Sequence, residues 1–187
     1  MDDCELLDRA RRGDEDAFGQ LFARHQRAIF RYAAHMCGRD AGDDIVQETF
    51  LAVLKQTGRY DSSRGTVSAY LFGIARHCAL KRTAAGANRR GDEEIDEAVD
   101  VSPACAPTVL EELSRTEAVE ALRAAVDSLP AIYREAIVLC ELEEMDYAAA
   151  AGIMQCPVGT VRSRLHRAKA LLADKLAAKP MVSGSRS

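Results

Sequence analysis

The sequence predicts an all-α fold of two small helical domains joined by a flexible acidic linker. Both ends of the chain repeat apolar residues at helical spacing, and neither end shows strand alternation or hairpin turns. Residues 86–114 carry two basic and eight acidic side chains with few large apolar groups, which is typical of a linker. We therefore expect domains at residues 1–85 and 115–179, and a disordered tail at 180–187.

Composition excludes several classes of protein. Of 187 residues, 48% are hydrophobic and 29% charged, as in an ordinary globular chain. No apolar run approaches the roughly 18 residues that cross a bilayer, and the acidic start MDDCELLD lacks the features of a signal peptide. Six cysteines are scattered without a CxxC pair, which favours reduced thiols. We expect a cytoplasmic protein without membrane insertion.

The first domain is expected to contain three helices. The first follows acidic residues 14–16, which suit a helix start, and its inward stripe is Phe18, Leu21, Phe22, His25, Ile29, Tyr32 and Met36. The second covers residues 43–56, with Ile45, Val46, Phe50, Val53 and Leu54 facing inward. The third covers residues 67–82 and turns Leu71, Phe72, Ile74 and Cys78 inward. Arg76, His77, Lys81 and Arg82 are expected to form its basic edge.

The second domain contains a helix-turn-helix pattern. Helices are expected at residues 116–130 and 131–142, followed by a short helix at 147–154. Asp146 is a plausible N-cap of the short helix, and Pro157 suits the first turn of the next one. A short helix, a tight turn at 155–157 and a longer basic helix form the plan whose second helix enters the DNA major groove.

The last helix has a basic side. The net charge of −4 hides residues 159–179, which carry six basic side chains and one acidic one. An isolated basic face is usually only solvated surface, but within a helix-turn-helix DNA contact is the better interpretation. Which arginine reads a base stays open. The residues on or beside the face opposite Val161, Leu165 and Leu172 include Arg162, Ser163, His166 and Arg167.

Two separate stretches resemble one family. LPAIYREAIVLCELEEMDYAAAAGIMQCPVGTVRSRLHRAKALL is similar to region 4 of the extracytoplasmic-function sigma factors, within the sigma-70 family. DDIVQETFLAVLKQ and VSAYLFGIARHCAL resemble their region 2. The resemblance implies a subunit that binds core RNA polymerase and directs transcription initiation at promoters by recognising their −10 and −35 elements.

The resemblance also implies three sets of contact residues. Residues that dock on the β′ clamp helices of core polymerase would be Asp43, Asp44, Gln47 and Glu48. Residues that meet the single-stranded −10 element, beside the loop 61–65, would be Tyr70, Arg76, His77, Lys81 and Arg82. Residues that meet the duplex −35 element would be Thr160, Arg162, Ser163, Arg164, His166 and Arg167.

Further partners follow from the resemblance. The second domain would meet the β flap of polymerase, the acidic linker would thread towards its active-site cleft, and a cognate anti-sigma factor is expected. An alternative role for the linker is that of a solvated spacer. No cofactor and no metal are expected, because neither the pair His35 and Cys37 nor the pair His77 and Cys78 has a familiar zinc-ligand spacing.

Three other classes of protein remain as alternatives. A free-standing helix-turn-helix regulator would explain the second domain, but a sensing domain of the response-regulator type should show strands. A thiol- or metal-responsive sensor would need convergent ligands. An enzyme is disfavoured, since no nucleophile, carboxylate pair or phosphate loop stands out.

The chain departs from the family pattern at a few positions. Residues 148–152 are four alanines and a glycine, so the first helix of the helix-turn-helix should be thinly packed. Gln155 replaces a common turn glycine, His77 a frequent Asn and Tyr70 a frequent Trp. The change at His77 leaves the −10 base preference open.

Overall fold

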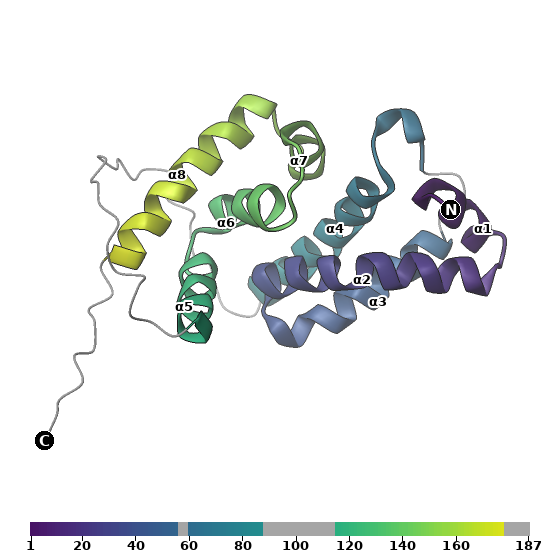
Figure 1. Cartoon of the computed structure of the whole chain (residues 1–187), viewed down its shortest axis with the longest axis horizontal. Helices are drawn as coiled ribbons and strands as arrows, with labels where there is room; N and C mark the ends of the chain where they lie inside the picture. The colour runs from purple at the N-terminus through teal and green to yellow at the C-terminus, as the bar shows by residue number, and fades with distance from the viewer. Residues whose placement is uncertain (56–59, 88–114, 178–187) are drawn as a thin grey trace, which may run out of the picture.

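The computed structural model describes residues 1–55, 60–87 and 115–177, and in these ranges every regular element is helical (Figure 1). The N-terminal lobe comprises α1 (Asp3–Arg11), α2 (Glu15–Cys37), α3 (Gly42–Lys55) and α4 (Val67–Ala87), with short 3₁₀ turns at Arg39–Ala41 and Ser62–Arg64. The C-terminal lobe comprises α5 (Arg115–Asp127), α6 (Ala131–Ile137), a π-helical turn (Val138–Leu142), α7 (Tyr147–Met154) and α8 (Val158–Ala177).

The predicted all-α fold with two helical lobes is confirmed. The predicted linker lies outside the described residues from 88 onwards, and so does the predicted tail. α4 continues to Ala87, past the predicted boundary at residue 85. No helix in the described ranges has both the length and the apolar character that a bilayer span requires.

Helix α2 is the centre of the N-terminal lobe, and α1, α3 and α4 all pack against it. The predicted inward residues Leu21, Ile29 and Tyr32 are completely buried. Phe50 of α3 stacks on Phe22 with ring centroids 4.8 Å apart. His25 faces a carboxylate instead of apolar side chains, because its Nε2 lies 2.7 Å from Asp3 Oδ2.

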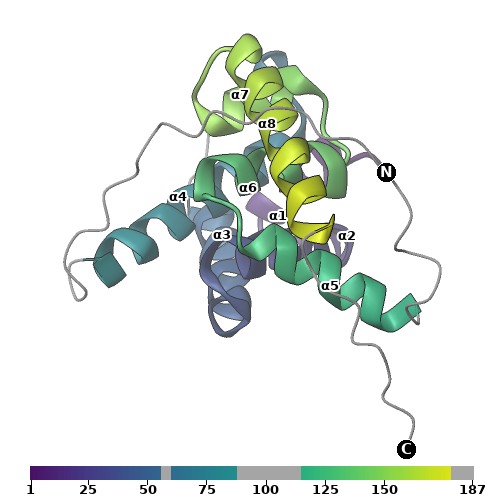
Figure 2. The same cartoon turned by 90° about the vertical axis from the view of Figure 1, so that its left-hand side faces the viewer.

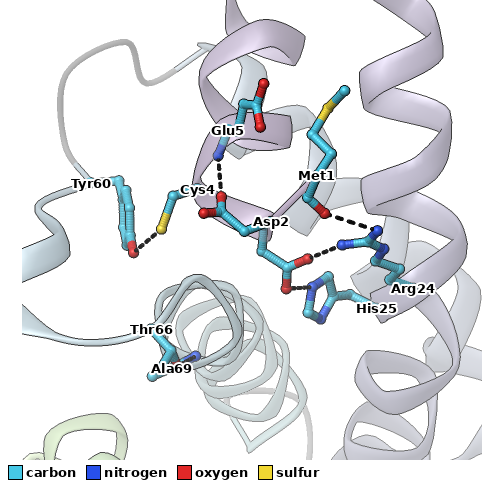
Figure 3. Close-up of polar contacts among 10 residues, drawn as sticks. Met1, Asp2, Cys4, Glu5, Arg24, His25, Tyr60, Thr66 and Ala69 are labelled. Carbon is cyan, nitrogen blue, oxygen red and sulfur yellow. Dashed lines mark hydrogen bonds and ion pairs between the residues drawn. The ribbon is translucent and has the colours of Figure 1, made fainter.

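The sequence prediction missed helix α1. Its N-cap is Asp2, whose carboxylate accepts the backbone N–H of Glu5 at 2.8 Å. Arg24 and His25 of α2 both bind Asp3, and Figure 3 shows these two residues on one side of the start of α1 and Tyr60, in contact with Cys4, on the other. A helix of nine residues has too few turns for periodicity to reveal it, and these contacts with α2 are tertiary.

The helix-turn-helix forms as predicted. Asp146 caps α7 by accepting the Ala149 N–H at 2.7 Å, and Pro157 immediately precedes α8. Val161 and Ala168 of α8 are completely buried against the rest of the lobe. Gln155 ends α7 in the left-handed region, where glycine is favoured.

The two lobes pack against each other, an arrangement that the sequence did not predict. Helix α7 lies beside α4, and α6 approaches the C-terminal half of α2 (Figures 1 and 2). Buried apolar side chains form one continuous cluster through both lobes. The molecule therefore has surfaces that are exposed in a separate lobe and covered in the whole chain.

Candidate nucleic-acid and partner interfaces

The outer face of α8 is the most accessible basic surface among the predicted sites. α8 lies on the side of the molecule away from the N-terminal lobe, and it is nearest the viewer in Figure 2. Arg162, Ser163, His166 and Arg167 are exposed, whereas Thr160 and Arg164 are half-buried. The predicted −35 residues are therefore brought together on one helix, with a wide exposed face.

Two contacts position the start of this face. The Arg162 guanidinium lies over the Tyr147 ring, 5.8 Å from its centroid. The Ser163 hydroxyl donates to the carbonyl of Thr160 at 2.9 Å. Tyr147 is 39% exposed and belongs to α7, so both helices of the helix-turn-helix contribute to one polar surface. The sequence reasoning did not single out Tyr147.

The predicted −10 residues do not form one exposed basic edge, because both arginines of the set are paired with carboxylates. Arg76 Nε donates to Glu135 Oε1 of the C-terminal lobe at 2.8 Å, and only 17% of the Arg76 side chain is exposed. Arg82 donates to Glu48 at 2.8 Å and to Asp44 at 3.1 Å. His77 and Lys81 are exposed. Arg76 therefore departs from the predicted basic edge, because the other lobe covers it.

Tyr70 lies at a cleft between the lobes. Its ring centroid is 5.5 Å from that of Tyr60, and Arg11 donates to its hydroxyl at 3.2 Å. Burial, together with the hydrogen bond to Cys4, raises the pKa of Tyr60 to about 12, so this phenol stays neutral. The cleft has a volume of 480 Å³ and is lined by the 60–66 segment and α4 on one side, and by residues of α7 on the other.

The four predicted polymerase-binding residues are exposed on α3. Asp43 and Gln47 line a groove of 580 Å³ between α2 and α3, while Asp44 and Glu48 lie beside it and bind Arg82. Sequence reasoning missed most of the groove, because it treated α2 chiefly as a core helix. The α2 residues that line the groove are Phe22, Gln26, Arg27, Phe30 and Arg31.

Two carboxylates at the lobe interface were also missed. Glu135 is 5% exposed and Glu143 keeps 4% of its side chain exposed, although both belong to charged residue types. Burial raises the pKa of Glu143, against the opposing effect of its partner Arg31. A signal was available for Glu135, since it directly precedes the apolar run AIVL on a helix. Its partners could not be read from that run.

Three of the cysteines in the described ranges are protected by burial. Burial raises the pKa of Cys37, Cys78 and Cys140, which keeps these thiols protonated and poorly nucleophilic. Within the described ranges, no three His, Cys, Asp or Glu side chains are grouped closely enough to hold a metal ion.

Comparison with known proteins decides the family. The family model of Sigma-70 region 2 matches residues 21–89, and the model of Sigma-70 region 4 matches residues 119–172. The chain is 33% identical over 185 residues to the ECF RNA polymerase sigma-E factor of Salmonella typhimurium (strain 14028s / SGSC 2262), covering 94% of this chain and 95% of that protein. The chain belongs to the ECF sigma factors of RNA polymerase. Its function is promoter-directed initiation of transcription, and a free-standing regulator is not favoured.

Two solved structures share this fold. CnrH, in complex with the cytosolic domain of CnrY, is 26% identical with a TM-score of 0.68, covering 95% of this ECF sigma factor and 99% of CnrH. The sigma factor RpoE, in complex with the anti-sigma factor NepR from Bartonella quintana, has a TM-score of 0.65 at 24% identity. The match covers 87% of this chain and 98% of RpoE, and it concerns the fold.

Proposed function

We propose that this sigma factor binds core RNA polymerase through the α2–α3 groove and meets promoter DNA through α4 and α8. The observation that carries the proposal is the polarity of α8. Val161, Leu165 and Ala168 are buried on one side, and Arg162, His166 and Arg167 are exposed elsewhere on the same helix. A helix held in this way, at the second position of a helix-turn-helix, presents side chains to the major groove.

The −35 role follows from the chemistry of the α8 face. Arginine reads guanine with two parallel hydrogen bonds or binds phosphate as a charge. Thr160 extends this surface towards the start of the helix, and Ser163 and Arg164 directly follow Arg162. Residues near the helix start are the ones that reach base edges, so Arg162 is our candidate for base contact and Arg167 for phosphate contact.

The −10 role is proposed for α4 and the loop before it. An unpaired strand needs cationic groups for its phosphates and a flat or hollow surface for its bases. His77 and Lys81 are exposed on α4, and Tyr70 lies at the cleft beside the 60–66 segment. Arg76 and Arg82 join this set once their carboxylate partners are displaced.

The polymerase contact is proposed for the groove between α2 and α3, which is lined by both apolar and polar side chains. Half-buried Phe22 and Phe30 provide an apolar floor, and Asp43 and Gln47 provide the polar rim. Such a combination suits a helical partner segment that presents apolar and basic side chains, as we propose for the β′ clamp helices. The β flap would meet the C-terminal lobe, and residues 88–114 would enter the polymerase cleft.

An anti-sigma factor is a further proposed partner. CnrH, which shares 26% identity with this chain, was solved in complex with the cytosolic domain of CnrY. A partner that covers the polymerase groove or the DNA faces would silence this chain too. Because RNA polymerase acts in the cytoplasm, we place the protein there, acting as a polymerase subunit and not as an enzyme of its own.

The test is run-off transcription with purified bacterial core polymerase on a pool of promoters from the source genome. We expect discrete transcripts only when the protein is added, and their loss in the double variant Arg162→Ala, Arg167→Ala. A matched double variant, Arg123→Ala with Lys175→Ala, removes the same charge from exposed positions outside the predicted set. Equal loss in both double variants would refute the −35 assignment, and no transcripts with the wild type would refute the function.

A further inference from the structure

The lobe interface holds a buried cluster of three polar groups. Glu135 Oε1 of α6 accepts two hydrogen bonds, from the Tyr32 hydroxyl at 2.9 Å and from Arg76 Nε at 2.8 Å. Tyr32 is completely buried and packs edge-to-face on Phe72, with ring centroids 5.6 Å apart. Both partners of Glu135 belong to the N-terminal lobe, so this carboxylate serves the interface.

Further polar contacts hold the C-terminal half of α2. Arg134 Nη1 donates to the carbonyl of His35 at 2.7 Å, in the last turn of α2, where helix carbonyls lack partners of their own. The His35 ring lies 2.6 Å from Asp127. Arg31 binds Glu143 with two hydrogen bonds, of 2.9 and 2.7 Å. Side chains of α5 and α6, together with Glu143 directly after the π-helical turn, thus converge on the C-terminal half of α2.

The covered surface coincides with part of the proposed −10 face. Arg76, which would bind the DNA strand, is occupied by Glu135, and the cleft beside Tyr70 has α7 as its second wall. The exposed residues of α8 stay open, because α8 lies on the side of the molecule away from the N-terminal lobe, at the front of Figure 2. Closure of the lobes therefore blocks one DNA face and leaves the other free.

We propose that the C-terminal lobe is an internal competitor of the −10 strand, with the Glu135 carboxylate occupying Arg76 until the lobes separate. This inference rests on the proposed function. A carboxylate can replace a phosphate as the acceptor for a guanidinium, so the same arginine serves the closed chain and the DNA complex.

The contact between Glu135 and Arg76, which we call the latch, is of a kind that can open. Separation of the lobes returns water to both Arg76 and Glu135, which offsets the lost ion pair, so a buried pair of this kind contributes little net stability. A Cβ placed on Gly73 of α4 or Gly152 of α7 would meet no heavy atom within 4 Å, so α4 and α7 do not interlock at these glycines. Binding to polymerase can then supply the free energy of opening.

The first measurement is small-angle X-ray scattering of the full chain without polymerase. We expect a compact wild type and an expanded Glu143→Arg variant, in which two cations face each other across the interface. Adding Arg31→Glu restores opposite charges and should restore compactness. The matched control Glu141→Arg makes the same charge change in the same turn, where Glu141 binds Lys169 of its own lobe, and should stay compact.

The second measurement is the sigma concentration that half-saturates run-off transcription. A closed molecule must open before it can act, so a large closed population weakens the apparent affinity of the sigma factor. If closed molecules outnumber open ones about tenfold, Glu135→Gln should lower the half-saturating concentration by up to about tenfold, because the variant is already open. The control Glu141→Gln should match the wild type.

Each outcome decides between the proposals. An extended wild type, or variants Glu143→Arg and Glu135→Gln that stay as compact as the wild type, would overturn the latch. Variants that are expanded but half-saturate transcription at the same concentration as the wild type would also overturn the latch. Failure of every variant and the wild type to start transcription would instead refute the proposed function, and with it the latch as a control of initiation.

Discussion

At the scale of single residues, Gln155 shows how one backbone conformation defines the turn of the helix-turn-helix. It ends α7 with φ 53° and ψ 44°, in the left-handed region that L-residues with a Cβ adopt reluctantly. Glycine is common here in the family that the chain resembles, and the conformation explains that preference. The backbone of Gln155 is therefore strained, and glycine at this position would avoid the strain.

Replacing Gln155 by glycine should stabilise the C-terminal lobe. Glycine has no Cβ, so it removes the close contact between Cβ and the following carbonyl oxygen. The larger entropy of glycine in the unfolded state reduces this gain, which leaves a net stabilisation of about 0.5–1 kcal/mol. Urea unfolding followed by circular dichroism measures the change. The variant Gln155→Ala keeps a Cβ and should show no gain, so equal stabilisation by alanine would contradict the backbone explanation.

Asp14 connects stability to pH. As the N-cap of α2 it accepts the Ala17 N–H at 3.0 Å and also binds Arg9, and these contacts hold its pKa below the usual 3.8. A carboxylate with a lowered folded-state pKa contributes stability above the unfolded pKa and loses it as pH falls through the folded value.

The N-terminal lobe should therefore lose stability in acid, as the pH falls below the unfolded pKa of 3.8 and through the lower folded value. In Asp14→Asn, which retains a side-chain cap but cannot titrate, the acid-dependent loss should be smaller. Urea midpoints across this range give the comparison. Identical pH profiles for the variant and the wild type would show that Asp14 does not contribute.

At the scale of elements, α2 serves three surfaces at once. One face fills the core with Leu21, Ile29 and Tyr32, a second lines the groove with α3, and its C-terminal half carries the lobe contacts. The groove depends on how closely α3 begins beside α2. Gly42, the first residue of α3, permits that approach, because a Cβ there would lie 2.5 Å from the Phe30 ring.

Gly42→Ala should displace the Phe30 ring and reshape the groove. Overpacking of this kind destabilises by about 1–3 kcal/mol, and the change in the groove should weaken binding to core polymerase. Unfolding and a polymerase pull-down measure the two effects.

Gly152→Ala is the matched control, since no heavy atom lies within 4 Å of the added Cβ. It should stabilise α7 by about 1 kcal/mol, the difference in helix propensity between alanine and glycine. Destabilisation by both alanines would show that the Phe30 contact is not the cause.

At the scale of the whole molecule, the closed arrangement makes the two DNA faces unequal. The basic face of α8 is on the outside, whereas α4 is partly covered by the C-terminal lobe. The free protein should therefore meet duplex DNA before it can hold an unpaired strand.

This inequality predicts a selective effect of Glu135→Gln on the free protein. Affinity for duplex DNA should match that of Glu141→Gln, which carries the same charge change, while affinity for single-stranded DNA should rise above it. Because both variants alter long-range attraction to phosphates equally, their ratio isolates the covered face. Fluorescence anisotropy with labelled DNA measures both affinities, and an equal rise for both forms of DNA would contradict a selective latch.

Local pattern was sufficient for much of this architecture. Helical spacing located α2, α3, α4 and the helices of the C-terminal lobe other than the short α7, because a helix that buries one face must repeat apolar residues every three or four positions. The N-cap at Asp146 and the place of Pro157 before α8 involve hydrogen bonds within four residues, so sequence neighbours are enough to reveal them. The family resemblance needed only residue order, and the comparisons confirm it.

Contacts between distant residues were decided by the tertiary structure. Glu135 meets Tyr32 and Arg76 across 103 and 59 positions of the chain, and Arg31 meets Glu143 across 112. No periodicity encodes such pairs, because their geometry depends on how the lobes pack and which charges become buried together. Periodicity identified Arg76 as a cation beside the core, and packing of the lobes gave it a carboxylate partner.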